Sequence, residues 1–110
     1  MYRVVITTPA QRDLTEQHDW WAEHRSAEQA IRWFADFYRA LEALANVPER
    51  HPMAPENGKW PFELRQLTFG LGRRPSHRAL FRVLGDQVIV LRTRHLAQSA
   101  LKYDDLAPKA

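Results

Sequence analysis

Residues 77–94, HRALFRVLGDQVIVLRTR, decide the fold of this 110-residue chain. Two runs rich in aliphatic and β-branched residues flank the dipeptide Gly85-Asp86, a combination typical of a tight hairpin turn. We therefore expect two antiparallel strands, His77–Leu84 and Gln87–Arg94. Every other element can be placed relative to this hairpin.

The alternation of side chains along the two strands predicts two chemically different faces. In the first strand, Arg78, Leu80 and Arg82 lie opposite Ala79, Phe81 and Val83. In the second strand, Ile89 and Leu91 are expected opposite Val88, Val90, Arg92 and Arg94. One face is then expected to pack on helices, while the other presents arginines among apolar side chains.

Two helices are predicted upstream of the hairpin. Thr8 followed by Pro9 is a typical helix start, and this helix is expected to run to about His24 and to bury Ala10, Leu14 and Trp21. Ser26 and Gln29 form a capping box that opens a second helix. Its apolar stripe at helical spacing ends before Pro48 and comprises Ala30, Ile31, Phe34, Phe37, Tyr38, Leu41, Leu44 and Ala45. The aromatic residues of the two helices (Trp20, Trp21, Trp33, Phe34, Phe37 and Tyr38) are expected mainly to form the core and the helix–helix contact. Trp20 and Trp33 fall off the main apolar faces, however, and a residual exposed aromatic patch would indicate a partner or dimer surface.

The remaining segments complete an α+β pattern. Tyr2–Thr7 is expected to be a strand buried on both faces, residues 48–61 a loop with four of the seven prolines, and Phe62–Phe69 another strand. The order is strand, helix, helix, strand, strand, strand. It predicts one domain over residues 1–110, a two-layer sandwich with a helical hairpin on a mainly antiparallel four-stranded sheet.

Charge is distributed unevenly along the chain. Residues 59–102 hold nine basic residues against two acids, a net charge of +7, whereas residues 1–58 hold six against nine. Arginines concentrated on strands suit a phosphate or an acidic partner protein. The chain has no cysteine, which excludes disulfides and thiolate metal sites and fits a cytoplasmic location. It has no apolar run long enough for a membrane span.

Several segments together resemble the RelE/ParE family of bacterial toxins. They are residues 64–67 (LRQL), 77–83 (HRALFRV) and 90–95 (VLRTRH), with 48–52 (PERHP) after the second helix. The resemblance covers nearly the whole chain. It implies the toxin half of a type II toxin–antitoxin pair, in complex with a cognate antitoxin. RelE-like members cleave mRNA in the translating ribosome, and ParE-like members poison DNA gyrase without known phosphodiester chemistry.

Metal-independent RNA cleavage needs a base, an acid and cations around the phosphate. The resemblance to RelE-like nucleases implies that Arg78 is a catalytic strand arginine and that His95 supplies the acid. Arg65 and Glu63 complete the candidate catalytic set, Glu63 as the base, and His77 is a second base candidate. The candidate phosphate-binding residues are Arg94, Arg92, Arg82, Arg73 and Arg74. No metal and no cofactor is expected.

Ribosome-dependent mRNA cleavage is our leading hypothesis from the sequence, and gyrase inhibition is the alternative. The C-terminal tyrosine and the lysine cluster of several such nucleases have no clear counterpart here, which keeps the gyrase alternative open. The arginines are equally interpretable as a solvated sheet face or as a docking surface for an acidic antitoxin. A third possibility is an inactive toxin that its antitoxin still binds.

Overall fold

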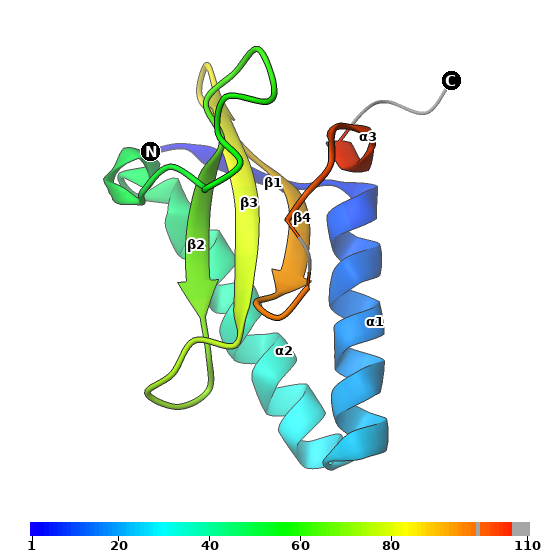
Figure 1. The fold of residues 1–110 in the computed structure, drawn as a ribbon. Helices are drawn as coiled ribbons and strands as arrows, with labels where there is room; N and C mark the ends of the chain where they lie inside the picture. Colours follow the sequence, from blue (N-terminus) through cyan, green and yellow to red (C-terminus); the bar gives the residue numbers. More distant parts are fainter. Residues whose placement is uncertain (99, 107–110) are drawn as a thin grey trace.

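A computed structural model, which describes residues 1–98 and 100–106, has the predicted α+β architecture in two layers (Figure 1). Two long helices, α1 (Thr8–His24) and α2 (Ala27–Glu42), pack on one face of a four-stranded sheet. The strands are β1 (Arg3–Ile6), β2 (Arg65–Phe69), β3 (His77–Leu84) and β4 (Gln87–His95), and a short helix α3 (Tyr103–Leu106) follows. Two single-turn 3-10 helices, Ala43–Ala45 and Pro48–Arg50, lie between α2 and β2. No helix among the described residues is long and apolar enough to cross a membrane.

The sheet order is β1-β4-β3-β2, with β1 parallel to β4 and the other neighbours antiparallel. The strand β1 is therefore an edge strand. Its Val4 and Ile6 pack on the helix-side core, whereas Arg3 and Val5 are exposed. The prediction that this strand is buried on both faces is wrong, because no element within residues 1–98 and 100–106 covers the second face at this edge.

A bulge in the β3–β4 pair changes the predicted faces. Leu80 pairs with Arg92 while Phe81 pairs with Val90, so Leu91 is an extra residue in β4. An extra residue reverses the alternation beyond it. Arg92 and Arg94 therefore lie on the face of Arg78, Leu80 and Arg82, and the prediction that they share a face with Val88 and Val90 is wrong.

The helix starts follow from side-chain caps. Thr7 caps α1, since its Oγ1 accepts a hydrogen bond from the Ala10 N–H at 3.3 Å, so the cap lies one residue before the predicted Thr8. Pro9 stands in the first turn, where its missing N–H is not needed. The predicted cap of α2 is confirmed, with Ser26 Oγ accepting from the Gln29 N–H at 3.0 Å.

The predicted apolar stripe of α2 is largely confirmed, but the structure adds Trp33 to the core and leaves Ile31 outside it. The buried positions are Ala30, Trp33, Phe37 and Leu41 of α2 and Leu44 of the following 3-10 helix, and they recur at three- and four-residue spacing. Trp33 is fully buried, whereas Ile31 is 65% exposed, so both were assigned to the wrong side. The stripe passes through position 33 because Trp33 packs against Trp21, Phe37 and His77.

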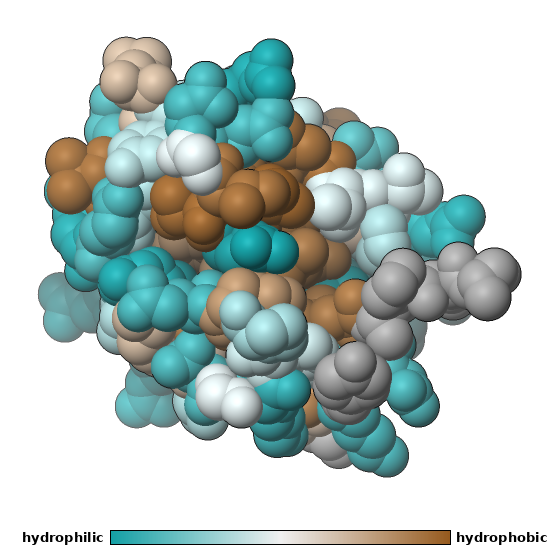
Figure 2. Space-filling model, turned by 90° about the horizontal axis from the view of Figure 1, so that it is seen from above, coloured by the Kyte–Doolittle hydropathy of each residue, from teal (hydrophilic) through white to brown (hydrophobic). Residues whose placement is uncertain are grey.

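A second, smaller core covers the opposite face of the sheet. Leu80 of β3 packs there with Ala54, Trp60 and Leu64 of the 48–64 loop and with Leu101, which is fully buried. Figure 2 looks down on the end of the molecule that carries the N-terminus, this loop and the β3–β4 turn, and hydrophobic atoms gather near its centre. The exposed apolar residues of these segments include Met1, Val5, Met53 and Leu84. The loop and Leu101 thus cover part of the sheet face that carries the arginines.

Candidate functional site

Arg78, the expected catalytic arginine, lies in a buried ion pair. Its guanidinium donates to both carboxylate oxygens of Glu56 and, at 3.1 Å, to Gln66 Oε1. Glu56 also accepts a hydrogen bond of 2.9 Å from the Leu101 N–H. The hydrogen bonds from Arg78 lower the pKa of the Glu56 carboxyl to about 2, so this carboxylate is charged at neutral pH. Arg78 is only 8% exposed, and Glu56 neutralises its charge. Through Glu56, the ion pair connects β3 to the 48–64 loop and to Leu101 of the C-terminal segment.

Arg65 and Glu63 do not lie near Arg78: Arg65 is on the opposite face of the sheet, and Glu63 precedes β2. Arg65 pairs with Phe81 in the sheet register, so its side chain starts from the helix-side face. Its Nη1 donates to the backbone carbonyls of Glu49 and His51 at 2.9 and 2.7 Å. The Glu63 side chain is 70% exposed and only 3.9 Å from the Arg65 guanidinium. Both residues are therefore placed around the start of β2 and the Pro48–Arg50 turn.

His95 and His77 form a cross-strand pair on the helix side. They are register partners, and their ring centroids are 5.0 Å apart. His77 is 3% exposed, and burial, followed by the charge of His95, lowers its pKa to about 4. His95 is exposed at the end of β4, where its Nδ1 accepts from the Ala97 N–H at 2.9 Å. Because neighbouring residues of a strand point to opposite faces, these imidazoles and the Arg78 guanidinium are separated by the sheet.

The candidate phosphate-binding arginines are also dispersed. Arg82 lies over the Phe62 ring at 4.2 Å, a cation–π contact. It is on the sheet face that points away from α1 and α2, which we call the outer face. Arg73 and Arg74 are exposed in the β2–β3 connection. Arg94 is half-buried on β4, where it is the cross-strand partner of Arg78. These residues give the outer face and one loop their positive charge, but the structure does not bring them together around one point.

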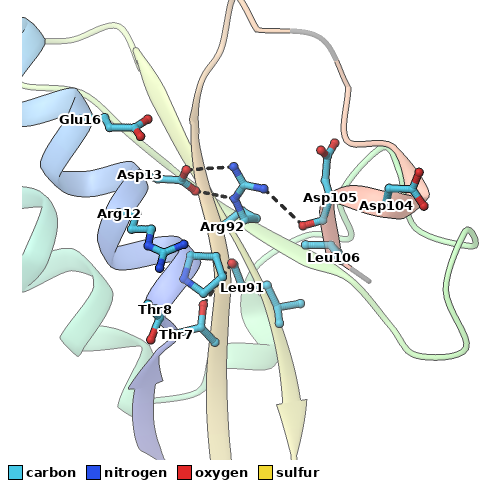
Figure 3. Close-up of a pocket in the computed structure, with 11 residues that line it drawn as sticks. Thr7, Thr8, Arg12, Asp13, Glu16, Leu91, Arg92, Asp104, Asp105 and Leu106 are labelled. Carbon is cyan, nitrogen blue, oxygen red and sulfur yellow. Dashed lines mark hydrogen bonds and ion pairs between the residues drawn. The ribbon is translucent and has the colours of Figure 1, made fainter. Parts of the chain in front are cut away.

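The fifth of these arginines, Arg92, lines a groove between α1 and β4 (Figure 3). Its Nε and Nη2 donate to the two carboxylate oxygens of Asp13 at 2.6 and 2.9 Å, and its Nη1 donates to the Asp105 carbonyl at 3.2 Å. Asp13, which was not predicted from the sequence, raises the Arg92 pKa through this hydrogen bond. The sequence could have indicated that Asp13 has a partner. It lies on the buried face of α1 beside Ala10 and Leu14, where an unpaired charge is costly.

Asp13 and Gln17 also complete the edge of β4. β1 pairs with β4 only as far as Val90, so the backbone groups beyond it need other partners. The Asp13 carboxylate accepts from the Thr93 N–H at 3.0 Å, and Gln17 Nε2 donates to the Thr93 carbonyl at 3.0 Å. Side chains of α1 thus substitute for the missing strand and fix the wall of the groove.

The sequence-predicted residues therefore fall into separate places. The structure brings His77 and His95 together, and it pairs Arg65 loosely with Glu63. It places Arg78 in the Glu56 ion pair and Arg92 in the Asp13 ion pair. Among the described residues, no group of three or more histidine, aspartate or glutamate side chains lies where it could hold a metal ion.

Comparison with known proteins gives two findings. The model of the family described as ParE toxin of type II toxin-antitoxin system, parDE, matches residues 4–100. A solved chain from the chromosomal ParDE TA system from P. aeruginosa superposes with a TM-score of 0.70 at 25% sequence identity. The superposition covers 86% of this chain and 96% of that chain. No curated protein matches the sequence.

Proposed function

The chain belongs to the ParE toxin family of type II toxin–antitoxin systems, and we propose that it arrests growth by inhibiting DNA gyrase rather than by cleaving mRNA. Family membership implies an antitoxin partner. The target, DNA gyrase or mRNA, is the part of the function that we propose here. Gyrase inhibition needs a binding surface, whereas cleavage needs an acid, a base and cations around one phosphate.

The separation of the cleavage candidates by the sheet carries the proposal. A phosphodiester in contact with Arg78 on one face is out of reach of His95 and His77 on the other face. Arg78 is also neutralised by Glu56, so it offers little net charge to a pentavalent phosphorane. Arg65 already donates to two carbonyls and lies on the helix side. These contacts support a structural rather than a catalytic role for Arg78 and Arg65.

The charge of the chain is compatible with a protein target. Arg78 and Arg92 of the outer face are both bound to carboxylates of the chain itself. Two adjacent exposed cations, Arg73 and Arg74, lie on the β2–β3 loop. Such a surface favours contact with an acidic protein segment over the cradle of hydrogen bonds that positions a reacting phosphate.

One experiment separates the two targets. The full chain is expressed from an inducible promoter, and transcript ends and gyrase-linked DNA breaks are mapped in the same cells. We expect DNA breaks with intact messages, and we expect His95→Ala, an exposed site, to keep toxicity. Cuts inside translated messages that disappear in His95→Ala would instead support the ribosome-dependent nuclease.

Arg78 needs a paired variant in this test, because Arg78→Ala alone leaves a buried carboxylate without its partner. The double variant Glu56→Gln/Arg78→Met removes both charges, and the amide oxygen that replaces the carboxylate can still accept from the Leu101 N–H. If the folded double variant keeps toxicity, Arg78 is not needed for chemistry. Loss of toxicity with normal antitoxin binding and normal thermal stability would argue against the gyrase proposal. Antitoxin binding by a wild-type chain that causes no growth defect would indicate an inactive toxin.

A further inference from the structure

A second cavity opens beside the groove of Figure 3, between α1 and the ends of β3 and β4. It has a volume of about 390 Å³ and shares Asp13 and Glu16 with the groove. Pockets for small molecules span about 300–1,000 Å³, so this cavity suits a group of side-chain size better than a large ligand. The proposed function makes no use of it.

The floor of the cavity carries a hydrogen-bond acceptor without a partner. His77 lines the cavity, and its Nδ1 lies 2.8 Å from Ser76 Oγ. The Ser76 hydroxyl donates to the Phe69 carbonyl at 3.5 Å, so we assign the Nδ1 hydrogen to the contact with Ser76. The imidazole Nε2 then has a free lone pair, and no described residue donates to it. The low pKa of His77 keeps this ring neutral at pH 7.

The wall of the cavity is a fixed aromatic surface. The Trp20 side chain lines the cavity and is 47% exposed, although tryptophan is highly buried on average. Its ring stacks on His24 with centroids 4.6 Å apart and an interplanar angle of 14°, and it meets Trp21 edge to face. Glu16, one helical turn before Trp20, adds a carboxylate to the same wall. The ring is thus held in place beside a negative charge.

These features select the charge and the shape of the ligand. A lone pair, a carboxylate and an indole face all favour a cation that donates N–H groups, and the described residues that line the cavity include no lysine or arginine. A phosphate or carboxylate would be repelled by Glu16. A guanidinium is planar, so it stacks on an indole while its N–H groups donate within its plane, which an ammonium cannot do.

We propose that this cavity receives the guanidinium group of an arginine side chain from a partner protein. A peptide segment is favoured over free arginine because the cavity adjoins the groove of Figure 3, where Asp104 and Asp105 add acids on the side across from Glu16. Arg12 and Arg92 also line this groove, but Arg92 is paired with Asp13. The partner is thus a protein with an exposed arginine in a basic segment. The inference does not depend on whether the toxin acts on gyrase or on mRNA.

The test uses the full chain with ¹⁵N-labelled tryptophan and two blocked peptides, Gly-Arg-Gly-Arg-Gly and Gly-Lys-Gly-Lys-Gly. The Trp20 indole resonance is assigned by its absence in Trp20→Phe. We expect the arginine peptide to shift this resonance and to bind roughly 3- to 10-fold more tightly than the lysine peptide. Glu16→Gln and Trp20→Ala should each weaken arginine binding by a similar factor.

Two matched controls lie on α2, outside the cavity. Glu28→Gln removes an exposed acid and Ile31→Ala an exposed apolar side chain, and both are expected to leave binding unchanged. Equal affinity for both peptides, or no shift at Trp20, would overturn the proposal. A Trp20 shift that grows with protein concentration without peptide, and that Arg73→Ala/Arg74→Ala abolishes, would assign the cavity to a second copy of the chain and overturn the assignment to a partner.

Discussion

Glu56 and Arg78 form a buried bidentate ion pair that joins the 48–64 loop to the centre of the sheet. Removal of one partner leaves an uncompensated buried charge, which typically costs about 3–5 kcal/mol. We therefore expect Arg78→Ala to lower the free energy of unfolding by about that amount. The double variant Glu56→Gln/Arg78→Met should be much closer to wild type, because both charges are absent. Urea unfolding of the two variants measures the difference. Equal destabilisation by both would show that packing, not charge, accounts for the effect.

The buried imidazole of His77 makes stability depend on pH. Its pKa is about 4 in the folded chain and close to 6.5 in the unfolded chain, so the unfolded state binds the proton first as the pH falls. The contribution is complete above pH 6.5 and is lost as the pH falls toward 4. It amounts to at most about 3 kcal/mol. Urea unfolding at several pH values should show this slope in wild type and a shallower one in His77→Gln.

A second variant keeps the His77 prediction testable if the first folds poorly. His77→Phe retains a ring of similar size next to Trp33, so its absolute stability differs from that of His77→Gln. Both variants lack the titrating group, and both should show the same shallower slope between pH 6.5 and 4. A slope as steep as wild type in both would place the titration elsewhere.

Val47 is the one non-glycine residue with positive φ among the described residues, at 45°. A β-branched side chain in the left-handed region is strained by roughly 1–2 kcal/mol, and Asn tolerates it better. Val47 is 61% exposed, so its replacement loses little packing. We expect Val47→Asn to raise the thermal midpoint, whereas Val47→Ile, which keeps the strain, should not. A lower midpoint for Val47→Asn would mean that Val47 makes contacts that outweigh the strain.

Local patterns predicted the fold because the signals for each element agree. The Gly85-Asp86 turn, the Ser26 capping box and the alternation in β3 each specify one structure from a few neighbouring residues. Burial was predicted less well where it depends on tertiary contacts. Trp33 rather than Ile31 faces the core because Trp21 and His77, distant in sequence, provide its surroundings.

The candidate site could not be predicted, for a different reason. One bulge at Leu91 reverses the alternation and moves Arg92 and Arg94 to the other face, and no turn residue marks it in the sequence. The partners of the arginines are also remote, since Glu56 precedes Arg78 by 22 residues and Asp13 precedes Arg92 by 79. Counting charges along the chain overestimates the free positive charge of the sheet, because arginines such as Arg78 and Arg92 are bound to carboxylates of the chain itself.

Asp13 stabilises the open edge of β4 as well as Arg92. Asp13→Ala removes the acceptor of the Thr93 N–H and leaves the Arg92 guanidinium without its carboxylate. Hydrogen bonds to charged groups contribute about 1.5–3 kcal/mol, so we expect a loss of that order in unfolding free energy. Hydrogen exchange should also accelerate at the Thr93 amide. Glu16→Ala, on the same groove, is the control and should leave Thr93 protected. Unchanged exchange at Thr93 in Asp13→Ala would contradict this role for the carboxylate.

Antitoxin association should depend on the exposed cations rather than on the paired arginines. Arg73 and Arg74 are exposed and adjacent, and an acidic, partly disordered antitoxin segment would be attracted to them over a distance. Charge of this kind changes the association rate and its dependence on salt more than the dissociation rate. We expect Arg73→Gln/Arg74→Gln to slow association and to reduce its salt dependence, as measured by stopped flow. Arg32→Gln/Arg39→Gln on α2 removes the same charge elsewhere on the surface and should have a smaller effect. An association rate that is independent of salt in wild type would instead favour recognition through apolar residues such as Val5 and Leu84.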